Sequence, residues 1–316
     1  MLNRRHIRVK VMQSIYAMLQ NGSDSLDKEE KFLFQSIDNI RDLYLIMISA
    51  LMELRNAEED YLEKIQKKHI ATPEERNPNK KFVNNIVLKQ LYESNALSIA
   101  LEDRKVYNWK NNDDYILLLL EAVKESEQYK NYMATRTSTF NEDRDFVAAL
   151  FDEVIAPNEK LYEYLEDYKL TWVDDIPLVN TAISKQLKSL TPPQEGREFL
   201  LIPRLYKDLD DKDYARDLFR KTVLNNNELA KEFIDKTPNW DAERIAELDS
   251  IILKMAICEF LKFPSIPAKV TINEYLEIAK EYSTPKSSIF INGILDNLIK
   301  EYQESKKMMK TGRGLM

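Results

Sequence analysis

Three arginines near the amino terminus carry the clearest chemistry in this chain of 316 residues. Arg4, Arg5 and Arg8 lie in the first turns of a helix that apolar spacing predicts over residues 3–20. The positive end of a helix dipole disfavours cations, so the cluster indicates either a frayed arm or a nearby anion. A basic start that serves only solubility is the third alternative, and this segment alone leaves all three open.

Residues suited to catalysis form no convincing group. The two histidines, His6 and His69, lie in the basic start and in a predicted loop, without the Cys/His spacing of a zinc site. Carboxylate pairs such as Asp113-Asp114 fall at predicted helix starts, where capping explains them. The sequence therefore predicts a protein that is not an enzyme and needs no cofactor.

The composition favours helices. Five glycines in the whole chain leave few turns that need positive φ, and 44% hydrophobic residues suffice for a packed core. Together with unbroken helical periodicity, this predicts an all-α fold without a sheet. No Gly-x-Gly-x-x-Gly or P-loop can be assembled from so few glycines, which excludes the common nucleotide-binding folds.

Cysteine usage and hydropathy indicate a cytoplasmic protein. Cys258, the single cysteine, falls on the apolar face of a predicted helix and is interpreted as a small buried side chain. One cysteine allows no disulfide within the chain, which fits a reducing cytosol. The start is not typical of a signal peptide, and no stretch of about eighteen apolar residues is present.

The net charge of −7 is unevenly distributed. Residues 1–23 carry four basic and no acidic residues, and residues 300–316 carry five basic and two acidic residues. The acidic surplus therefore belongs to the interior of the chain. Because binding depends on the local patch, the acidic total does not exclude an RNA ligand.

Residues 239–296 are predicted to form three amphipathic helices with clear start signals. The second is expected to open at a capping box made by Thr271 and Glu274. The third has Pro285 at its first position, where the missing N–H costs nothing. Gly293 lies inside the third helix, and a close approach of another helix is the expected reason.

Specific sequence patterns occur in this region and at the chain start. IPAKVTINEYLEIAKEYS is followed by KSSIFINGILDNL, and the chain opens with NRRHIRVKVMQSIYAM. The first two segments resemble the C-terminal signature of the NusB family, and the opening resembles that family's arginine-rich arm. The resemblance implies NusB-like helical bundles, here with an additional inserted helical region.

The resemblance also implies an RNA site. In NusB proteins the arm, a tyrosine and a phenylalanine contact boxA RNA, which implies these roles for Arg4, Arg5, Arg8, Tyr16 and Phe290. Single-stranded RNA requires cations for its phosphates and flat side chains for its bases. Core packing is the alternative for Phe290.

Two positions depart from the family pattern. Lys286 stands where the family often has an acidic residue, so it either adds a phosphate contact or alters base preference. His6 stands where another arginine is common, which removes one charge at neutral pH.

A partner surface is implied as well. NusB proteins work with NusE, a small basic ribosomal protein, and family members present acidic residues at the positions of Glu243 and Asp249. Stabilisation of a helix start by a carboxylate is the alternative for Glu243.

The predicted organisation has four parts. Two segments in the third part, 141–190 and 213–260, resemble each other at a spacing of 68 residues, or 69 after one inserted residue, through either a degenerate duplication or chance. The parts are an arm with the first helix at 1–22, a helical insertion of unknown role at 23–140, a NusB-like core at 141–305, and a disordered tail at 306–316.

These features predict an RNA-binding transcription antitermination factor. It would bind boxA-like RNA together with NusE, act on the transcription elongation complex and support ribosomal RNA transcription. Two alternatives are a helical adaptor that has lost RNA binding, and a relative of the NusB-like domains of RNA methyltransferases without catalytic activity.

Overall fold

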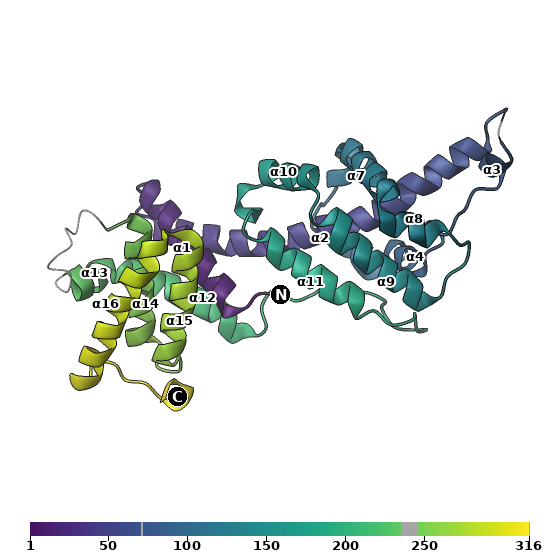
Figure 1. Cartoon of the computed structure of the whole chain (residues 1–316). Helices are drawn as coiled ribbons and strands as arrows, with labels where there is room; N and C mark the ends of the chain where they lie inside the picture. Colours follow the sequence, from purple (N-terminus) through teal and green to yellow (C-terminus); the bar gives the residue numbers. More distant parts are fainter. Residues whose placement is uncertain (71, 235–244, 316) are drawn as a thin grey trace. The chain divides into compact units, whose positions relative to one another are not determined.

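The computed structural model describes residues 1–70, 72–234 and 245–315, and every regular element in these ranges is helical (Figure 1). The predicted all-α fold is confirmed. None of the described helices combines the length and apolar character needed to cross a membrane. The chain divides into two compact units, of which unit 1 contains residues 38–205 and unit 2 contains residues 2–37 and 206–316.

Unit 2 joins the start of the chain to its end. Its first helix packs with α12, α14 and α15, although about 190 residues separate it from α12 in sequence. The helices of unit 2 are α1 (Arg4–Gln20), α12 (Leu209–Leu224), α13 (Asn226–Ile234), α14 (Glu247–Lys262), α15 (Ala268–Tyr282) and α16 (Pro285–Glu304), with the first turns of α2 (Leu26–Gln66) and the short η4 (Gly312–Leu315).

The ends of α1 follow from local sequence. The side chain of Asn3 accepts a hydrogen bond from the backbone N–H of His6, which caps the amino end. Gly22 has a φ of +57°, a conformation in which glycine avoids the penalty of a Cβ atom, and it ends the helix where the sequence predicted.

Unit 1 is formed by the middle of the chain. Its core contains Trp172, which is fully buried and donates a hydrogen bond from Nε1 to the Asn39 carbonyl at 2.9 Å. The helices of unit 1 are the rest of α2, α3 (Pro73–Arg76), α4 (Ile86–Tyr92), α5 (Asn95–Asp103), α6 (Asn108–Asn111), α7 (Asp113–Glu125), α8 (Glu127–Met133), α9 (Phe140–Leu150), η1 (Phe151–Ile155), α10 (Glu159–Tyr168), η2 (Leu170–Trp172) and α11 (Ile176–Lys188).

The unit boundaries differ from those expected. The predicted core at 141–305 is divided, because residues 141–205 pack within unit 1. Helical periodicity reports which face of α9 or α11 is buried but not which helices cover it, so it could not locate this boundary.

The duplication of 141–190 and 213–260 stays a prediction, and burial supports it. Trp240, the match of Trp172, lies outside the described residues. The other matched apolar pairs agree closely in exposure: Leu150 and Leu218 (both 0%), Phe151 and Phe219 (both 0%), Leu161 and Leu229 (both 2%), and Ile183 and Ile252 (both 0%).

Lys310 and Thr311, in the segment that was expected to be disordered, contact the end of α14. Lys310 Nζ donates to the backbone carbonyls of Glu259 (3.2 Å) and Phe263 (3.1 Å), and the Thr311 N–H donates to the Pro264 carbonyl (3.0 Å). These carbonyls lie at the carboxyl end of α14, which attracts a cation. The sequence of the tail alone could not reveal this contact, because it does not show that the backbone carbonyls at the end of α14 lack hydrogen-bond donors.

Two local predictions in α15 and α16 are wrong. Helix α15 begins at Ala268, after Pro267, and therefore Thr271 and Glu274 lie inside the helix and form no capping box. The Gly293 site is open, because a Cβ atom added there would meet nothing within 4 Å. No neighbouring helix explains this glycine.

Gly293→Ala is therefore expected to stabilise the protein by about 1 kcal/mol, because alanine loses less backbone freedom than glycine in a helix. The urea midpoint followed by circular dichroism measures this. Gly314→Ala is the contrasting variant, because its Cβ would lie 1.9 Å from the Pro264 carbonyl oxygen and must displace the tail. An unchanged or lower midpoint for Gly293→Ala would contradict this account of the site.

Candidate functional site

A buried ion pair lies at the centre of unit 2. Arg8 in α1 donates from Nε and Nη2 to the two carboxylate oxygens of Glu259 in α14, at 2.9 and 2.8 Å. The two side chains are 2% and 0% exposed. This bidentate pair joins residues that are 251 positions apart in sequence.

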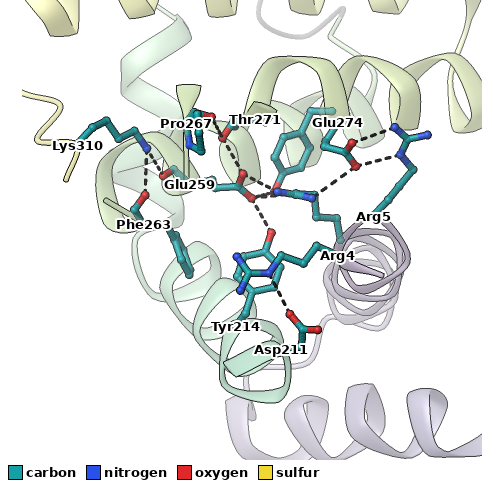
Figure 2. A network of polar contacts seen from close by, with 12 residues as sticks. Arg4, Arg5, Asp211, Tyr214, Glu259, Phe263, Pro267, Thr271, Glu274 and Lys310 are labelled. Atoms are coloured by element: carbon teal, nitrogen blue, oxygen red, sulfur yellow. Dashed lines mark hydrogen bonds and ion pairs between the residues drawn. The ribbon is translucent and has the colours of Figure 1, made fainter. Parts of the chain in front are cut away.

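Further donors surround the same carboxylate (Figure 2). Glu259 accepts from the Tyr214 hydroxyl at 2.6 Å, from Thr271 Oγ1 at 2.7 Å and from the Tyr275 hydroxyl at 3.4 Å. Helices α1, α12, α14 and α15 thus meet at one charge. A buried carboxylate is tolerated when several donors satisfy its oxygens.

The electrostatics of the pair follow from this packing. Burial alone would raise the pKa of Glu259, but the charge of Arg8 and the hydrogen bonds from Arg8, Tyr214 and Thr271 hold that pKa below its ordinary value. Burial would lower the pKa of Arg8, and the neighbouring Tyr214 and Glu259 instead raise it well above its ordinary value. Both groups are therefore charged at neutral pH.

The expectation that Arg8 belongs to an RNA-contacting arm is corrected. Its guanidinium is enclosed by Glu259 and lies 5.5 Å from the ring centre of Tyr214, so it is not presented to an external phosphate. Of the three alternatives considered for the arginine cluster, the nearby anion applies to Arg8, and that anion is Glu259. Sequence spacing could not identify the partner, because the two residues lie at opposite ends of the chain.

Arg4 and Arg5 are exposed, unlike Arg8. The Arg4 side chain is 42% exposed and donates from Nε to Asp211 at 3.0 Å. Arg5 is 40% exposed and makes a bidentate pair with Glu274, with both bonds at 3.0 Å. Figure 2 shows both pairs beside the buried network.

A cleft of about 680 Å³ opens at these two arginines. Its lining includes Arg4, Arg5 and Glu274 together with Pro267 and Val270. No acidic residue occupies the first turn of α1. The positive end of the helix dipole and two exposed guanidinium groups therefore act at the same place and favour an anionic ligand.

His6 adds no charge to this surface at neutral pH. Burial lowers its pKa below the ordinary 6.5, and the nearby cations Arg5 and Lys10 lower it further. The structure thus supports the expectation of one missing charge relative to an arginine.

The predicted aromatic residues lie elsewhere on unit 2. Tyr16 is 41% exposed and lines a second cleft, of about 390 Å³, with Met12, Gln13 and Tyr282. On α16, Lys286 is exposed and Phe290 is half-buried. Ile289 and Ile291, on either side of Phe290, lie on different faces of α16, as helical spacing requires: Ile289 is 76% exposed and Ile291 is fully buried.

The predicted partner residues have different outcomes. Glu243 lies outside the described residues. Asp249 is 5% exposed and accepts a hydrogen bond from Ser283 Oγ at 2.6 Å, so its interface role is corrected to an internal one. Its carboxylate connects the first turn of α14 to the segment between α15 and α16, a long-range contact that sequence does not reveal.

Sequence reasoning missed the carboxylates that organise the arginines. One signal for Glu259 was available, since it follows Met255 by four residues and therefore shares the apolar face of its helix. An acidic residue on such a face requires a buried partner. Asp211 and Glu274 carried no comparable signal, because acidic residues are common in the first turn of a helix, where Asp211 lies, and on helix surfaces.

Comparison with known proteins matches a family to most of the helices of unit 2 that follow residue 197. The NusB family model matches residues 198–300, which contain α12 to α15 and most of α16. The transcription antitermination protein NusB of Salinibacter ruber is 44% identical over 113 residues, which are 35% of this chain and 70% of the relative. The chain belongs to the NusB family.

Other relatives match the same family over shorter shares of their length. NusB of Chloroherpeton thalassium is 38% identical over 109 residues, covering 34% of this chain and 52% of the relative. NusB of Dictyoglomus turgidum is 46% identical over 87 residues, which cover 27% of this chain and 60% of the relative. Both relatives are again named transcription antitermination proteins. The chain thus spans between about half and 70% of these relatives.

A solved structure of T. maritima NusB is 26% identical and is matched over 89% of its length and 46% of this chain. Its TM-score of 0.30 supports no conclusion about shared architecture. The family match leaves out α1, which joins the matched helices through the pairs of Arg4, Arg5 and Arg8.

Proposed function

We propose that this chain is an RNA-binding transcription antitermination factor that binds boxA-like single-stranded RNA together with NusE. The observation that carries the proposal is the cleft at Arg4 and Arg5, in the unit that contains the family match. The relatives of this unit are named antitermination proteins, which supports the same role here.

The arginine pairs suit a surface that exchanges partners. An ion pair between partly exposed side chains contributes only about 0–1 kcal/mol, so a phosphate can share Arg5 with Glu274 at low cost. The Asp211 side chain is only 9% exposed, so a phosphate at Arg4 would bind beside this carboxylate and not replace it. Arg4 and Arg5 are both about two-fifths exposed, and Asp211 and Glu274 hold them at the cleft. One guanidinium group can donate two parallel hydrogen bonds to two oxygens of one phosphate, which favours RNA over a monovalent anion.

The bases would use the flat side chains of unit 2. In the proposal, Tyr16 offers its exposed ring at the second cleft and Phe290 offers the uncovered part of its ring. Lys286, one helical turn before Phe290, supplies a further cation for the backbone. Stacking of one base on an aromatic ring contributes about 1–3 kcal/mol.

The test is the double variant Arg4→Gln with Arg5→Gln, titrated with boxA RNA over a salt series. We expect at least a tenfold loss of affinity and a slope of log K against log salt that is less steep by about 1.4, or roughly 0.7 for each lost phosphate contact. The matched control is Arg216→Gln with Arg220→Gln. These two arginines belong to the same unit, are 40% and 38% exposed and pair with the acidic residue Glu30.

Equal losses in both double variants would show general electrostatics and not a site at the cleft. Unchanged affinity in Arg4→Gln with Arg5→Gln would show that RNA binds elsewhere on the chain, and no measurable RNA binding by the natural chain would favour the helical adaptor that has lost RNA binding. Melting temperatures of both variants exclude unfolding as the cause. Addition of NusE to the same titration tests the partner, and tighter RNA binding in its presence is expected.

NusE binding and RNA binding must then be linked reciprocally, because RNA has to tighten NusE binding by the same factor. Calorimetry of NusE with and without RNA measures that factor. A NusE affinity that RNA leaves unchanged would contradict the joint complex, although RNA binding by the chain alone could still stand.

A further inference from the structure

Unit 1 has a cleft that no part of the proposed function uses. Its volume is about 460 Å³, and its lining includes the aromatic residues Tyr92, Tyr107 and Trp109 with the carboxylates of Glu53 and Glu102. All of these residues lie on α2, α4, α5 and α6 or beside them, within unit 1.

The aromatic lining is partly exposed and partly fixed. Tyr92 and Tyr107 are 51% and 41% exposed, so both side chains are open to solvent at the cleft that they line. Trp109 is 5% exposed, and its Nε1 donates to the Ile46 carbonyl at 3.0 Å. That bond fixes the indole in place and satisfies its N–H.

The chain's own cations already lie over two of these rings. The Arg55 guanidinium is 5.2 Å from the ring centre of Tyr92, and the Lys110 ammonium is 5.3 Å from the ring centre of Tyr107. Aromatic faces attract cations at such distances. Glu59 neutralises Arg55 through bonds of 2.9 and 3.2 Å.

The net charge of unit 1 favours a positively charged ligand in this cleft. Residues 38–205 contain 30 acidic and 22 basic residues, a net charge of −8. The lining of the cleft contains two acidic residues, Glu53 and Glu102, and one basic residue, Lys110, so its own charge is negative. An RNA strand would be repelled by this unit, whereas a basic protein segment would be attracted.

We propose that this cleft binds an arginine side chain of a basic protein segment. The guanidinium plane would stack on the tyrosine rings, and its N–H groups would be accepted by Glu53 and Glu102. Arginine fits better than lysine, because only its planar group stacks and donates to two carboxylates together. The proposal does not rest on RNA or NusE binding by unit 2.

The test uses the full chain and a synthetic peptide with four Gly-Arg repeats and blocked ends, measured by calorimetry. The matched peptides carry lysine or neutral citrulline in place of arginine. We expect the arginine peptide to bind at least tenfold more tightly than the citrulline peptide and severalfold more tightly than the lysine peptide. Equal binding of the arginine and citrulline peptides would overturn the proposal.

Protein variants locate the binding. Glu53→Gln with Glu102→Gln should weaken binding of the arginine peptide at least tenfold, and Tyr107→Ala should weaken it severalfold. The matched control removes two exposed charges from elsewhere in unit 1, through Glu121→Gln with Glu166→Gln, and should change affinity less than twofold.

Two further outcomes would overturn the proposal. The first is an equal loss in the control variant, which would indicate attraction to the acidic unit as a whole. The second is full competition by a single-stranded RNA that still binds when Arg4 and Arg5 are replaced, which would make this cleft a nucleic-acid site. Tyr107→Ala keeps the test valid if the double carboxylate variant does not fold.

Discussion

Arg8→Met is expected to lower the free energy of unfolding by about 3–5 kcal/mol, since it leaves Glu259 charged, buried and without its bidentate partner. Urea denaturation followed by circular dichroism measures the loss. The matched control is Arg5→Met, which removes an equally good bidentate pair from a site that is 40% exposed. That control should cost less than about 1 kcal/mol.

Similar losses in Arg8→Met and Arg5→Met would contradict a structural role that depends on burial. The double variant Arg8→Met with Glu259→Leu gives a further check, because replacing both charges by apolar groups should recover part of the loss. Recovery would show that the unpaired charge, and not the lost volume, causes the instability.

The same pair has a pH signature. The folded-state pKa of Glu259 lies below its ordinary value of 4.5, so its contribution to stability is complete above that value. That contribution is lost as the pH falls through the folded pKa, below 4.5. Glu259→Gln should therefore be less stable than the natural chain at neutral pH, with a difference that narrows in acid.

Trp172→Ala is expected to destabilise unit 1 by about 3–5 kcal/mol, because it empties a fully buried site and removes the bond to the Asn39 carbonyl. Hydrogen exchange measured by mass spectrometry assigns the effect, which should appear in peptides from residues 38–205. The matched control is Tyr168→Ala, whose ring stacks on Trp172 at 5.5 Å but is 54% exposed. It should cost about 1 kcal/mol.

A loss of comparable size in Tyr168→Ala would show that the stacking contact, and not burial of the indole, holds this part of unit 1. Faster exchange in unit 2 alone would contradict the assignment of Trp172 to the core of unit 1. Trp172→Phe, which keeps most of the apolar volume, should fall between the two variants.

Local patterns in the sequence predicted much of the fold. The all-α class, the extent of α1 and the burial of Cys258 depend on periodicity, capping and hydropathy within a few turns of helix. The glycine stop after α1 is a property of the same kind. Such features are encoded by neighbouring residues, so they can be inferred without knowing what packs on each helix.

The candidate site depended on pairs that sequence does not connect. Arg4, Arg5 and Arg8 look equivalent in the sequence, yet the Arg8 side chain is 2% exposed while those of Arg4 and Arg5 are 42% and 40% exposed, because Arg8 pairs with the fully buried Glu259. Asp249 was misassigned for the same reason, since Ser283 contacts it from 34 residues away. Periodicity indicates a face but not its partner.

The pairing of Arg8 with Glu259 also affects how the protein is made. Helix α1 leaves the ribosome before α14, and Glu259 follows Arg8 by 251 residues. At about 5–20 residues per second, that interval is roughly 12–50 s. Until α12 and α14 emerge, the apolar side of α1 and a guanidinium destined for the interior lack these partners, while residues 38–205 emerge and can fold as a unit. The nascent chain therefore has to keep α1 soluble until α12 and α14 arrive, and Arg4 and Arg5, in the first turn of that helix, are the residues placed to do so.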